Sequence, residues 1–156
     1  MKKLPETILC ILNGMKNNRE VRIIDLTRFP DHRGSLTVIE ELKDIPFSIK
    51  RAYWVYDVPH NGTRGGHAHH EQQQIIIALS GSFSVIVDNG LSKQTYHLSD
   101  PSKGLYISAG IWNTLENFSS GAVCMVLASG SYDEDDYIRE YEEFLKIKQS
   151  DNSCPA

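Results

Sequence analysis

Two histidines one residue apart, His67 and His69, are the side chains in this sequence best suited to chemistry. Imidazole is the side chain whose unperturbed pKa lies nearest neutrality, so a pair can transfer protons or bind a metal ion. Arg64 precedes the pair by three residues and adds a permanent positive charge. These residues predict a proton-transfer or metal site with a cation just outside it.

The elements that position the pair are expected to be β-strands. If the chain is extended from Gly66 onward, successive side chains alternate between two faces. His67 and His69 then share one face with an apolar row that ends at Leu79, while His70 lies on the other face. We therefore expect one extended segment from the histidines to Leu79, with both imidazoles at the polar end of a pocket.

Other parts of the chain predict a protein built mainly from strands. Short β-prone segments alternate with turn residues at intervals of about 8–12 residues, which favours an antiparallel sandwich or barrel. Asp88-Asn89-Gly90 predicts a tight hairpin, because Asn and Gly both accept positive φ. Towards the end, apolar residues take helical spacing after a run of acidic residues, which predicts one amphipathic helix over about residues 133–148.

Length and charge limit the possible organisation. The chain has 156 residues, enough for one domain with a substantial core. We expect an N-terminal extension over residues 1–19, either disordered or a short helical turn, a single domain over residues 20–148, and a tail over residues 149–156. The net charge of -4 provides no basic surface for nucleic acid.

Cysteine usage and hydropathy indicate the compartment. Cys10, Cys124 and Cys154 are odd in number and have no metal-like spacing, so we interpret them as reduced thiols of a cytoplasmic protein. The apolar run over residues 8–12 is too short to cross a bilayer, and no cleavage pattern follows it. We therefore expect neither a membrane span nor a signal peptide.

Several motifs together resemble the cupin superfamily and, more closely, its sugar 3,4-ketoisomerases. His67-Ala68-His69 followed by Gly81 resembles the first cupin motif. The closer resemblance covers residues 21–145 and rests on Arg33-Gly34-Ser35-Leu36, Ile45–Arg51, Arg64–His69, Gly104-Leu105-Tyr106, Val126–Ser129 and Tyr132–Arg139. The resemblance implies an all-β fold, a cupin jelly roll formed as an antiparallel β-sandwich or barrel, with one C-terminal α-helix.

The resemblance also implies an activity. Such enzymes are isomerases that convert dTDP-4-oxo-6-deoxy-D-glucose to the 3-oxo sugar through an enediol or enediolate. Their product supplies 3-amino-3,6-dideoxy sugars to surface glycans such as lipopolysaccharide O-antigen and S-layer glycans. They are homodimers, and a strand exchanged between subunits would suit the open edge of a small sandwich. The expected partners are the dTDP-linked 4-oxo-6-deoxyhexose and a second subunit, without nucleic acid or membrane.

The resemblance assigns roles to individual residues. His69 is expected to remove the C3 proton, and His67 to act as the second acid–base or hydrogen-bonding group. Arginines and tyrosines nearby are expected to bind the diphosphate, the oxyanion and the thymine, since a guanidinium matches phosphate oxygens bidentately. The expected substrate-binding residues are Arg64, Arg51, Tyr53, Gln73, Tyr106 and Asn113, with Trp54 as a further aromatic candidate for the thymine.

The residues around the pair argue against a metal. A metal-dependent cupin would add a carboxylate and a third histidine, but these positions hold Gln73 or Gln74 and Asn113. A neutral amide is a poor ligand for divalent transition metals, so we expect no metal and no other cofactor. Related enzymes commonly carry histidine or arginine at the position of Asn113. Its role, and the galacto or gluco configuration of the product, are therefore left open.

Three other functions remain as alternatives. A nucleotide-sugar 3,5-epimerase would exchange the C5 proton with solvent, which a 3,4-isomerase would not. A metal-dependent cupin enzyme, such as a dioxygenase, would contain stoichiometric metal. A non-catalytic sugar-binding cupin would bind its ligand without turnover.

Overall fold

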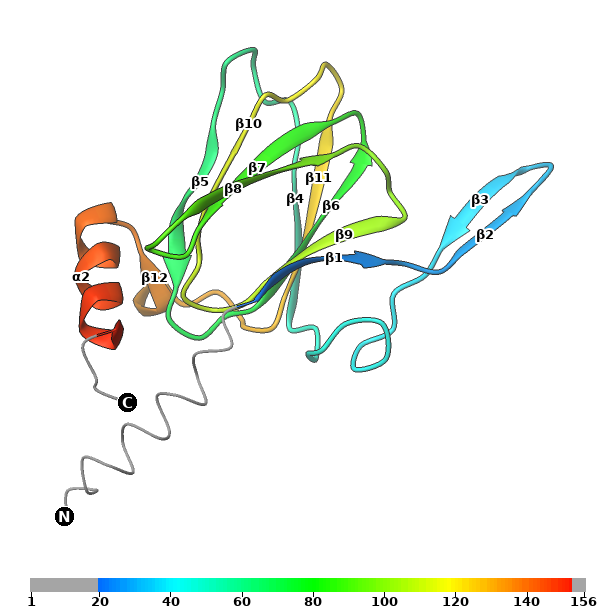
Figure 1. The fold of residues 1–156 in the computed structure, drawn as a ribbon. Helices are drawn as coiled ribbons and strands as arrows, with labels where there is room; N and C mark the ends of the chain where they lie inside the picture. The colour runs from blue at the N-terminus through cyan, green and yellow to red at the C-terminus, as the bar shows by residue number, and fades with distance from the viewer. Residues whose placement is uncertain (1–19, 153–156) are drawn as a thin grey trace.

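The computed structural model describes residues 20–152, so the extension expected over residues 1–19 lies outside the described residues. The described chain forms short antiparallel strands, one turn of 3-10 helix and one α-helix (Figure 1). The elements are β1 (Val21–Asp25), β2 (Arg28–Asp31), β3 (Gly34–Thr37), β4 (Arg51–Val55), β5 (Arg64–His69), β6 (Gln74–Ser80), β7 (Phe83–Asp88), β8 (Lys93–Leu98), β9 (Lys103–Ile107), β10 (Trp112–Glu116), β11 (Val123–Ala128), η1 (Glu134–Asp136), β12 (Tyr137–Ile138) and α2 (Tyr141–Asn152). Within this range no helix has the length and apolar character needed to span a bilayer.

Two five-stranded sheets face each other across a shared core (Figure 1). The first sheet has the order β1-β9-β6-β11-β4, and the second has the order β12-β5-β10-β7-β8. Both contribute inward side chains to one apolar cluster, which includes Ile76, Phe83, Val85, Leu105, Leu115 and Val126. The expected all-β antiparallel architecture with a single C-terminal helix is confirmed.

The chain between β1 and β4 covers the outer face of the first sheet. Leu26, Ile45 and Phe47 pack there against Ile75 and Ile77 of β6. The alternate residues of β6 belong to the inner cluster, so this strand is buried on both faces. Burial on both faces explains why its sequence is an apolar run without polar alternation.

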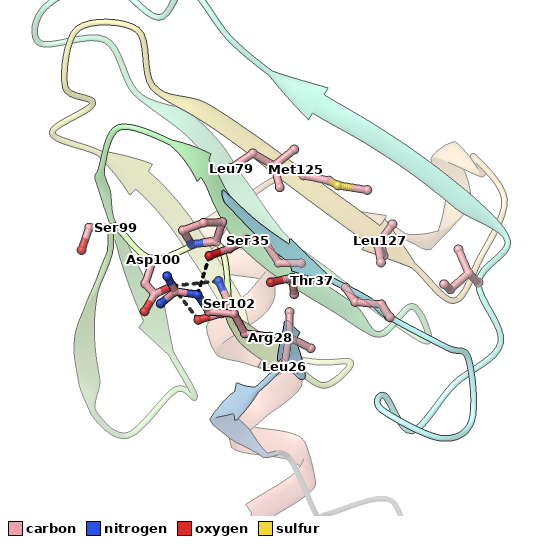
Figure 2. A pocket seen from close by; sticks show the side chains of 14 residues that line it. Leu26, Arg28, Ser35, Thr37, Leu79, Ser99, Asp100, Ser102, Met125 and Leu127 are labelled. Carbon is pink, nitrogen blue, oxygen red and sulfur yellow. Dashed lines mark hydrogen bonds between the residues drawn. The ribbon is translucent and has the colours of Figure 1, made fainter. Parts of the chain in front are cut away.

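A hairpin of β2 and β3 projects away from the two sheets (Figure 1). Phe29 and Leu36 pair across it and are 56% and 60% exposed. Beside the hairpin, a groove of about 1010 Å³ runs over the outer face of the first sheet (Figure 2). Its lining includes Leu79, Met125 and Leu127 from the sheet, together with the hairpin and the turn before β9.

The C-terminal segment differs from the predicted helix over residues 133–148. The acidic residues form the short η1 turn, where the Asp133 side chain accepts from the Asp135 backbone N–H at 3.1 Å. Tyr137 and Ile138 then pair with β5, and α2 covers residues 141–152. The helix prediction was therefore wrong at both ends, because pairing with the edge of the second sheet overrides the helical periodicity. The predicted domain end at residue 148 falls inside α2.

The segment from the histidines to Leu79 is not one strand. β5 ends at His69 in the second sheet, and β6 begins at Gln74 in the first sheet. The prediction that the histidines share a face with the apolar row that ends at Leu79, which includes Ile75 and Ile77, was therefore wrong. Those two isoleucines point to the outer side of the first sheet.

Candidate active site

The two histidines lie side by side at the end of β5. His67 pairs with Asn113 of β10, and His69 pairs with Tyr137 of β12. The two imidazole rings are 5.1 Å apart between centroids, in an edge-to-face arrangement. His69 is 3% exposed, and His67 is half-buried. Ala68 between them packs on the opposite side against Ile138 and Phe144, so the histidines point away from α2.

A β-bulge sets the start of this strand. The register between β5 and β10 shifts so that Arg64 pairs with Leu115 and Gly65 with Thr114, before His67 pairs with Asn113. Gly65 and Gly66 have φ values of 75° and 72°, the left-handed region that glycine accepts without steric cost. The bulge restarts the alternation, while Arg64 is exposed at the outer end of the strand.

The carboxylate of Asp136 holds one side of the His69 ring. Nδ1 of His69 lies 2.9 Å from Oδ2 of Asp136. The same carboxylate accepts the backbone N–H groups of Glu71 at 2.8 Å and Gln72 at 3.3 Å. These bonds tie η1 to the turn between β5 and β6 and fix the orientation of the carboxylate.

Gln72 and Arg51 hold the other side of the ring. Nη2 of Arg51 donates to Oε1 of Gln72 at 3.1 Å, and Nε2 of Gln72 lies 3.2 Å from Nε2 of His69. A guanidinium has only donors, so the Gln72 oxygen must face Arg51 and its NH₂ must face His69. Nε2 of His69 is therefore an acceptor, and Nδ1–H donates to Asp136. The ring is the neutral Nδ1–H tautomer.

Both histidines favour the neutral form. Burial, followed by the neighbouring His67, lowers the pKa of His69 from 6.5 to about 4, against the opposing effect of Asp136. Burial also lowers the pKa of His67, with smaller contributions from Arg139 and Arg51. Two adjacent neutral imidazoles can accept a proton at neutral pH.

Tyrosines and arginines surround the imidazoles. The Tyr137 ring lies 4.4 Å from that of His69 and 5.0 Å from that of His67. Cζ of Arg51 lies 5.1 Å from the centre of the Tyr53 ring, and Cζ of Arg139 lies 4.4 Å from that of Tyr137. Burial, followed by Tyr137, raises the pKa of Tyr53 to about 12, so this phenol is a neutral hydrogen-bond donor.

Arg51, Tyr53 and Asn113 are predicted site residues that the structure brings to the histidine pair. Arg51 reaches the pair through Gln72, and it also donates to the Tyr137 hydroxyl at 3.3 Å. Asn113 is 2% exposed and donates to the backbone oxygen of His67 at 3.4 Å. Asn113 therefore holds the strand of the histidines rather than their rings.

Gln73 and Tyr106 are not brought to the pair. The Tyr106 hydroxyl donates to Oε1 of Gln73 at 2.7 Å, and Tyr106 belongs to the cluster on the outer face of the first sheet. Trp54 is exposed on the same strand as Tyr53 but on its alternate side. The substrate-binding role of these residues stays a prediction that their placement does not favour.

Several residues that contact the pair were not predicted from the sequence. They are Gln72 from the turn after β5, with Asp136 and Tyr137 from the segment around η1. Tyr132 and Arg139 lie one contact further out, against Arg51 and Tyr137. The segment 132–139 carries part of the family resemblance, and that was the available signal. Its assignment to a helix start hid the contacts.

The donor set is better suited to acid–base chemistry than to metal binding. Both ring nitrogens of His69 already face protein groups, and the positions of the further cupin ligands hold amides. Across residues 20–152, no group of three or more His, Cys, Asp or Glu side chains could hold a metal ion.

Comparison with known proteins identifies the family. The family model described as "FdtA: WxcM-like, C-terminal" matches residues 19–149. A TDP-4-oxo-6-deoxy-alpha-D-glucose-3,4-oxoisomerase of Aneurinibacillus thermoaerophilus is 46% identical over 127 residues, which cover 81% of this chain and 91% of that protein.

Solved structures give the same result. The 3,4-ketoisomerase QdtA of Thermoanaerobacterium thermosaccharolyticum, in complex with TDP, superposes with a TM-score of 0.82 at 39% identity, covering 83% of this chain and 95% of that one. The TDP-quinovose 3,4-ketoisomerase WlaRB of Campylobacter jejuni gives a TM-score of 0.78 at 42% identity, covering 83% and 98%. This chain belongs to the FdtA, WxcM-like family, and its resemblance to the sugar 3,4-ketoisomerases is confirmed.

Proposed function

We propose that this chain is a sugar-nucleotide 3,4-ketoisomerase that converts dTDP-4-oxo-6-deoxy-D-glucose to the 3-oxo sugar. The observation that carries the proposal is His69, a buried neutral imidazole with Nδ1 on Asp136 and Nε2 as an acceptor. The relatives reported above are named as 3,4-oxoisomerases or 3,4-ketoisomerases, which favours this activity over that of a 3,5-epimerase.

The reaction moves a carbonyl between neighbouring carbons. Nε2 of His69 takes the proton from C3, the C–H electron pair forms the C3–C4 double bond, and the C4 oxygen becomes negative. The proton on O3 then moves to O4, with His67 as the relay. The His69 imidazolium, whose proton exchanges with solvent, then protonates C4, which leaves the carbonyl at C3 and restores the neutral ring. Asp136 stabilises the imidazolium that forms on His69.

Arg51 and Tyr53 are assigned to the developing oxyanion. Nε of Arg51 is buried and has no hydrogen-bond partner among the described residues, so it is available to a ligand oxygen. Tyr53 remains a neutral phenol, because its pKa is raised to about 12 by burial, followed by Tyr137. Donors aimed at developing charge in a buried site are worth more than the same donors in water. Arg64, exposed at the start of β5, is assigned to the diphosphate.

The reaction proceeds in this proposal without a metal or an organic cofactor. The C4 carbonyl already acidifies the C3 proton, and neutral histidines supply the acid–base groups. The amides at the positions of the other cupin ligands support this choice.

An NMR time course with dTDP-4-oxo-6-deoxy-D-glucose in deuterated buffer tests the function. The expected result is a 3-oxo product with deuterium at C4 and an unexchanged proton at C5. Exchange at C5 with an inverted product would make the protein a 3,5-epimerase instead. Binding of TDP with no conversion would make it a non-catalytic cupin. The same spectra report the configuration at C4.

We also propose that the protein is a cytoplasmic homodimer. The projecting β2–β3 hairpin, with Phe29 and Leu36 exposed, supports contact with a second copy. Cys124 is a buried free thiol, in keeping with a reducing compartment. The 3-oxo product has the carbonyl that a transaminase needs at C3, which supports a place in the synthesis of amino sugars for O-antigen or S-layer glycans.

A further inference from the structure

Gln72 makes contacts that the proposed reaction does not yet use. Its side chain is buried and lies between a permanent cation, Arg51, and the proposed base, His69. Gly130 lies close to it, because a Cβ at that position would stand 3.3 Å from Oε1 of Gln72. The hydrogen bond from Arg51 holds the amide with its oxygen towards the guanidinium.

This orientation opposes protonation of His69. An imidazolium carries a hydrogen on Nε2, which would point at the NH₂ group of Gln72. Rotation of the amide would relieve that clash but would turn the NH₂ towards Arg51, which has only donors. Protonation of His69 therefore costs a hydrogen bond on one side of Gln72 or the other.

Other charged and titratable groups also face His69. Asp136 favours the imidazolium, whereas His67 and Arg51 oppose it. The Tyr137 ring packs against the imidazole, and its hydroxyl accepts from Arg51. Without the opposing groups, Asp136 would raise the pKa of His69, and the protonated ring could not act as a base. Gln72 acts against Asp136 at the opposite nitrogen.

We propose that Gln72 is a positioning residue that keeps Nε2 of His69 unprotonated in the free enzyme and leaves this nitrogen when the sugar binds. The inference rests on the proposed function, in which His69 is the base. C3 of the sugar must approach the nitrogen that now accepts from Gln72, so the amide is displaced in the complex. The influence of Gln72 on His69 therefore belongs to the free enzyme.

Titration of His69 by NMR in the ligand-free protein tests the inference without any turnover. Gln72→Leu removes the amide at similar volume, and we expect the pKa of His69 to rise by about one unit, the scale of a single hydrogen bond. Gln72→Glu keeps an acceptor for Arg51 but places an anion against Nε2, so a larger rise is expected. Gln94→Glu adds the same charge at an exposed position of β8 and leaves the pKa unchanged.

The pH profiles separate positioning from a general structural role. The acid limb of kcat/KM reports the free enzyme, and that of kcat reports the complex. In Gln72→Leu the limb of kcat/KM moves to higher pH, while that of kcat stays near its wild-type position. A merely structural effect would move both limbs together or neither.

The wild-type protein gives a test that no folding defect can affect. The ¹⁵N shifts of His69 at neutral pH should show hydrogen on Nδ1 and none on Nε2. An Nε2–H tautomer, an imidazolium at neutral pH, or an unchanged pKa in both folded Gln72 variants would overturn the inference. Failure of the NMR assay for ketoisomerase activity, with these shifts as expected, would instead overturn the proposed function.

Discussion

At the scale of single residues, the site depends on opposing effects on one imidazole. The Asp136 carboxylate at 2.9 Å favours the protonated form of His69. Burial, His67 and Arg51 favour the neutral form and lower its pKa to about 4. The result is a ring that is neutral before the reaction and has a carboxylate in place to stabilise the charge it acquires.

Replacement of the base should separate catalysis from binding. His69→Asn should lower kcat by at least about 10³-fold, because general-base catalysis contributes on this scale. Affinity for TDP, measured by calorimetry, should stay close to that of the wild type. The matched control is His97→Asn on the exposed side of β8, which should retain full activity. Near-native turnover in His69→Asn would remove this residue from the mechanism.

The pH dependence follows from the direction of the His69 shift. Because the pKa of His69 is lowered from 6.5 to about 4, the imidazole stays neutral in the free enzyme down to mildly acidic pH. We expect kcat/KM to show no loss from this group between pH 7 and pH 6 and to fall as the pH approaches about 4. An acid limb centred near 6.5 would contradict this assignment.

The same shift predicts how stability depends on pH. Between about pH 6.5 and pH 4 the unfolded chain binds a proton at His69 that the native protein does not bind. The contribution of this group therefore lowers the free energy of unfolding as the pH falls through this range, and it has no such effect above it. Urea unfolding of the wild type and of His69→Asn, each measured at the two ends of this pH range, isolates the contribution of His69 to stability. The variant should lack this contribution.

We expect the negative charge of Asp136 to contribute to kcat, in addition to its role in orienting the His69 ring. In Asp136→Asn one oxygen can still accept, but the NH₂ group would face a backbone donor or the imidazole. We expect kcat to fall about 10²- to 10⁴-fold, as for other His-orienting carboxylates. Circular dichroism checks that the fold is retained. Wild-type kcat in this variant would show that the imidazolium needs no counter-charge.

At the scale of elements, the β-bulge at the start of β5 is required for the register of the histidines. Gly65→Ala would place a Cβ 2.8 Å from the backbone oxygen of Asn113, in addition to the strain of a φ of 75°. Gly66 has a φ of 72°, and a Cβ added there would have no atom within 4 Å, so Gly66→Ala isolates the cost of the backbone conformation. We expect the Gly66 variant to lose about 1–2 kcal/mol, and the Gly65 variant clearly more. Equal losses in urea unfolding would contradict the close approach.

Elements set by local pattern were predictable, and elements set by distant pairing were not. The hairpin at Asp88-Asn89-Gly90 was predicted correctly and joins β7 to β8. The break between His69 and Gln74 lies in a polar run without Gly or Pro, so the sequence contained no turn signal. β12 forms only because β5 offers a free edge. The helical spacing of its residues led to the wrong prediction of a helix there.

The same distinction explains the site. The histidine pair was predictable because both residues lie on one strand, two positions apart. Asp136 is separated from His69 by 67 residues, and only the fold brings it to the ring. Gln72 carried no signal, since an amide in a polar turn is ordinary until a cation and an imidazole are seen on either side of it.

At the scale of the whole molecule, the two faces of the first sheet have different surroundings. Its inner face meets the second sheet, and the histidine pair lies at one end of that interface. Its outer face carries the groove of about 1010 Å³ beside the β2–β3 hairpin (Figure 2). The hairpin has no residue in the buried core, so its exposed apolar pair does not stabilise the monomer.

The hairpin therefore provides a test of the proposed dimer. A double variant with Phe29→Ser and Leu36→Ser removes the apolar pair that the hairpin exposes. In the single chain these side chains are 56% and 60% exposed. We expect the double variant to be monomeric by analytical ultracentrifugation, while the wild type is a dimer. The control is Leu91→Ser in the β7–β8 turn, where a leucine is 80% exposed and its loss should leave the dimer intact. Since neither hairpin residue belongs to the core, we expect the monomer to stay folded, so loss of the dimer reports the subunit contact itself. A double variant that remains fully dimeric would place the subunit contact elsewhere on the surface.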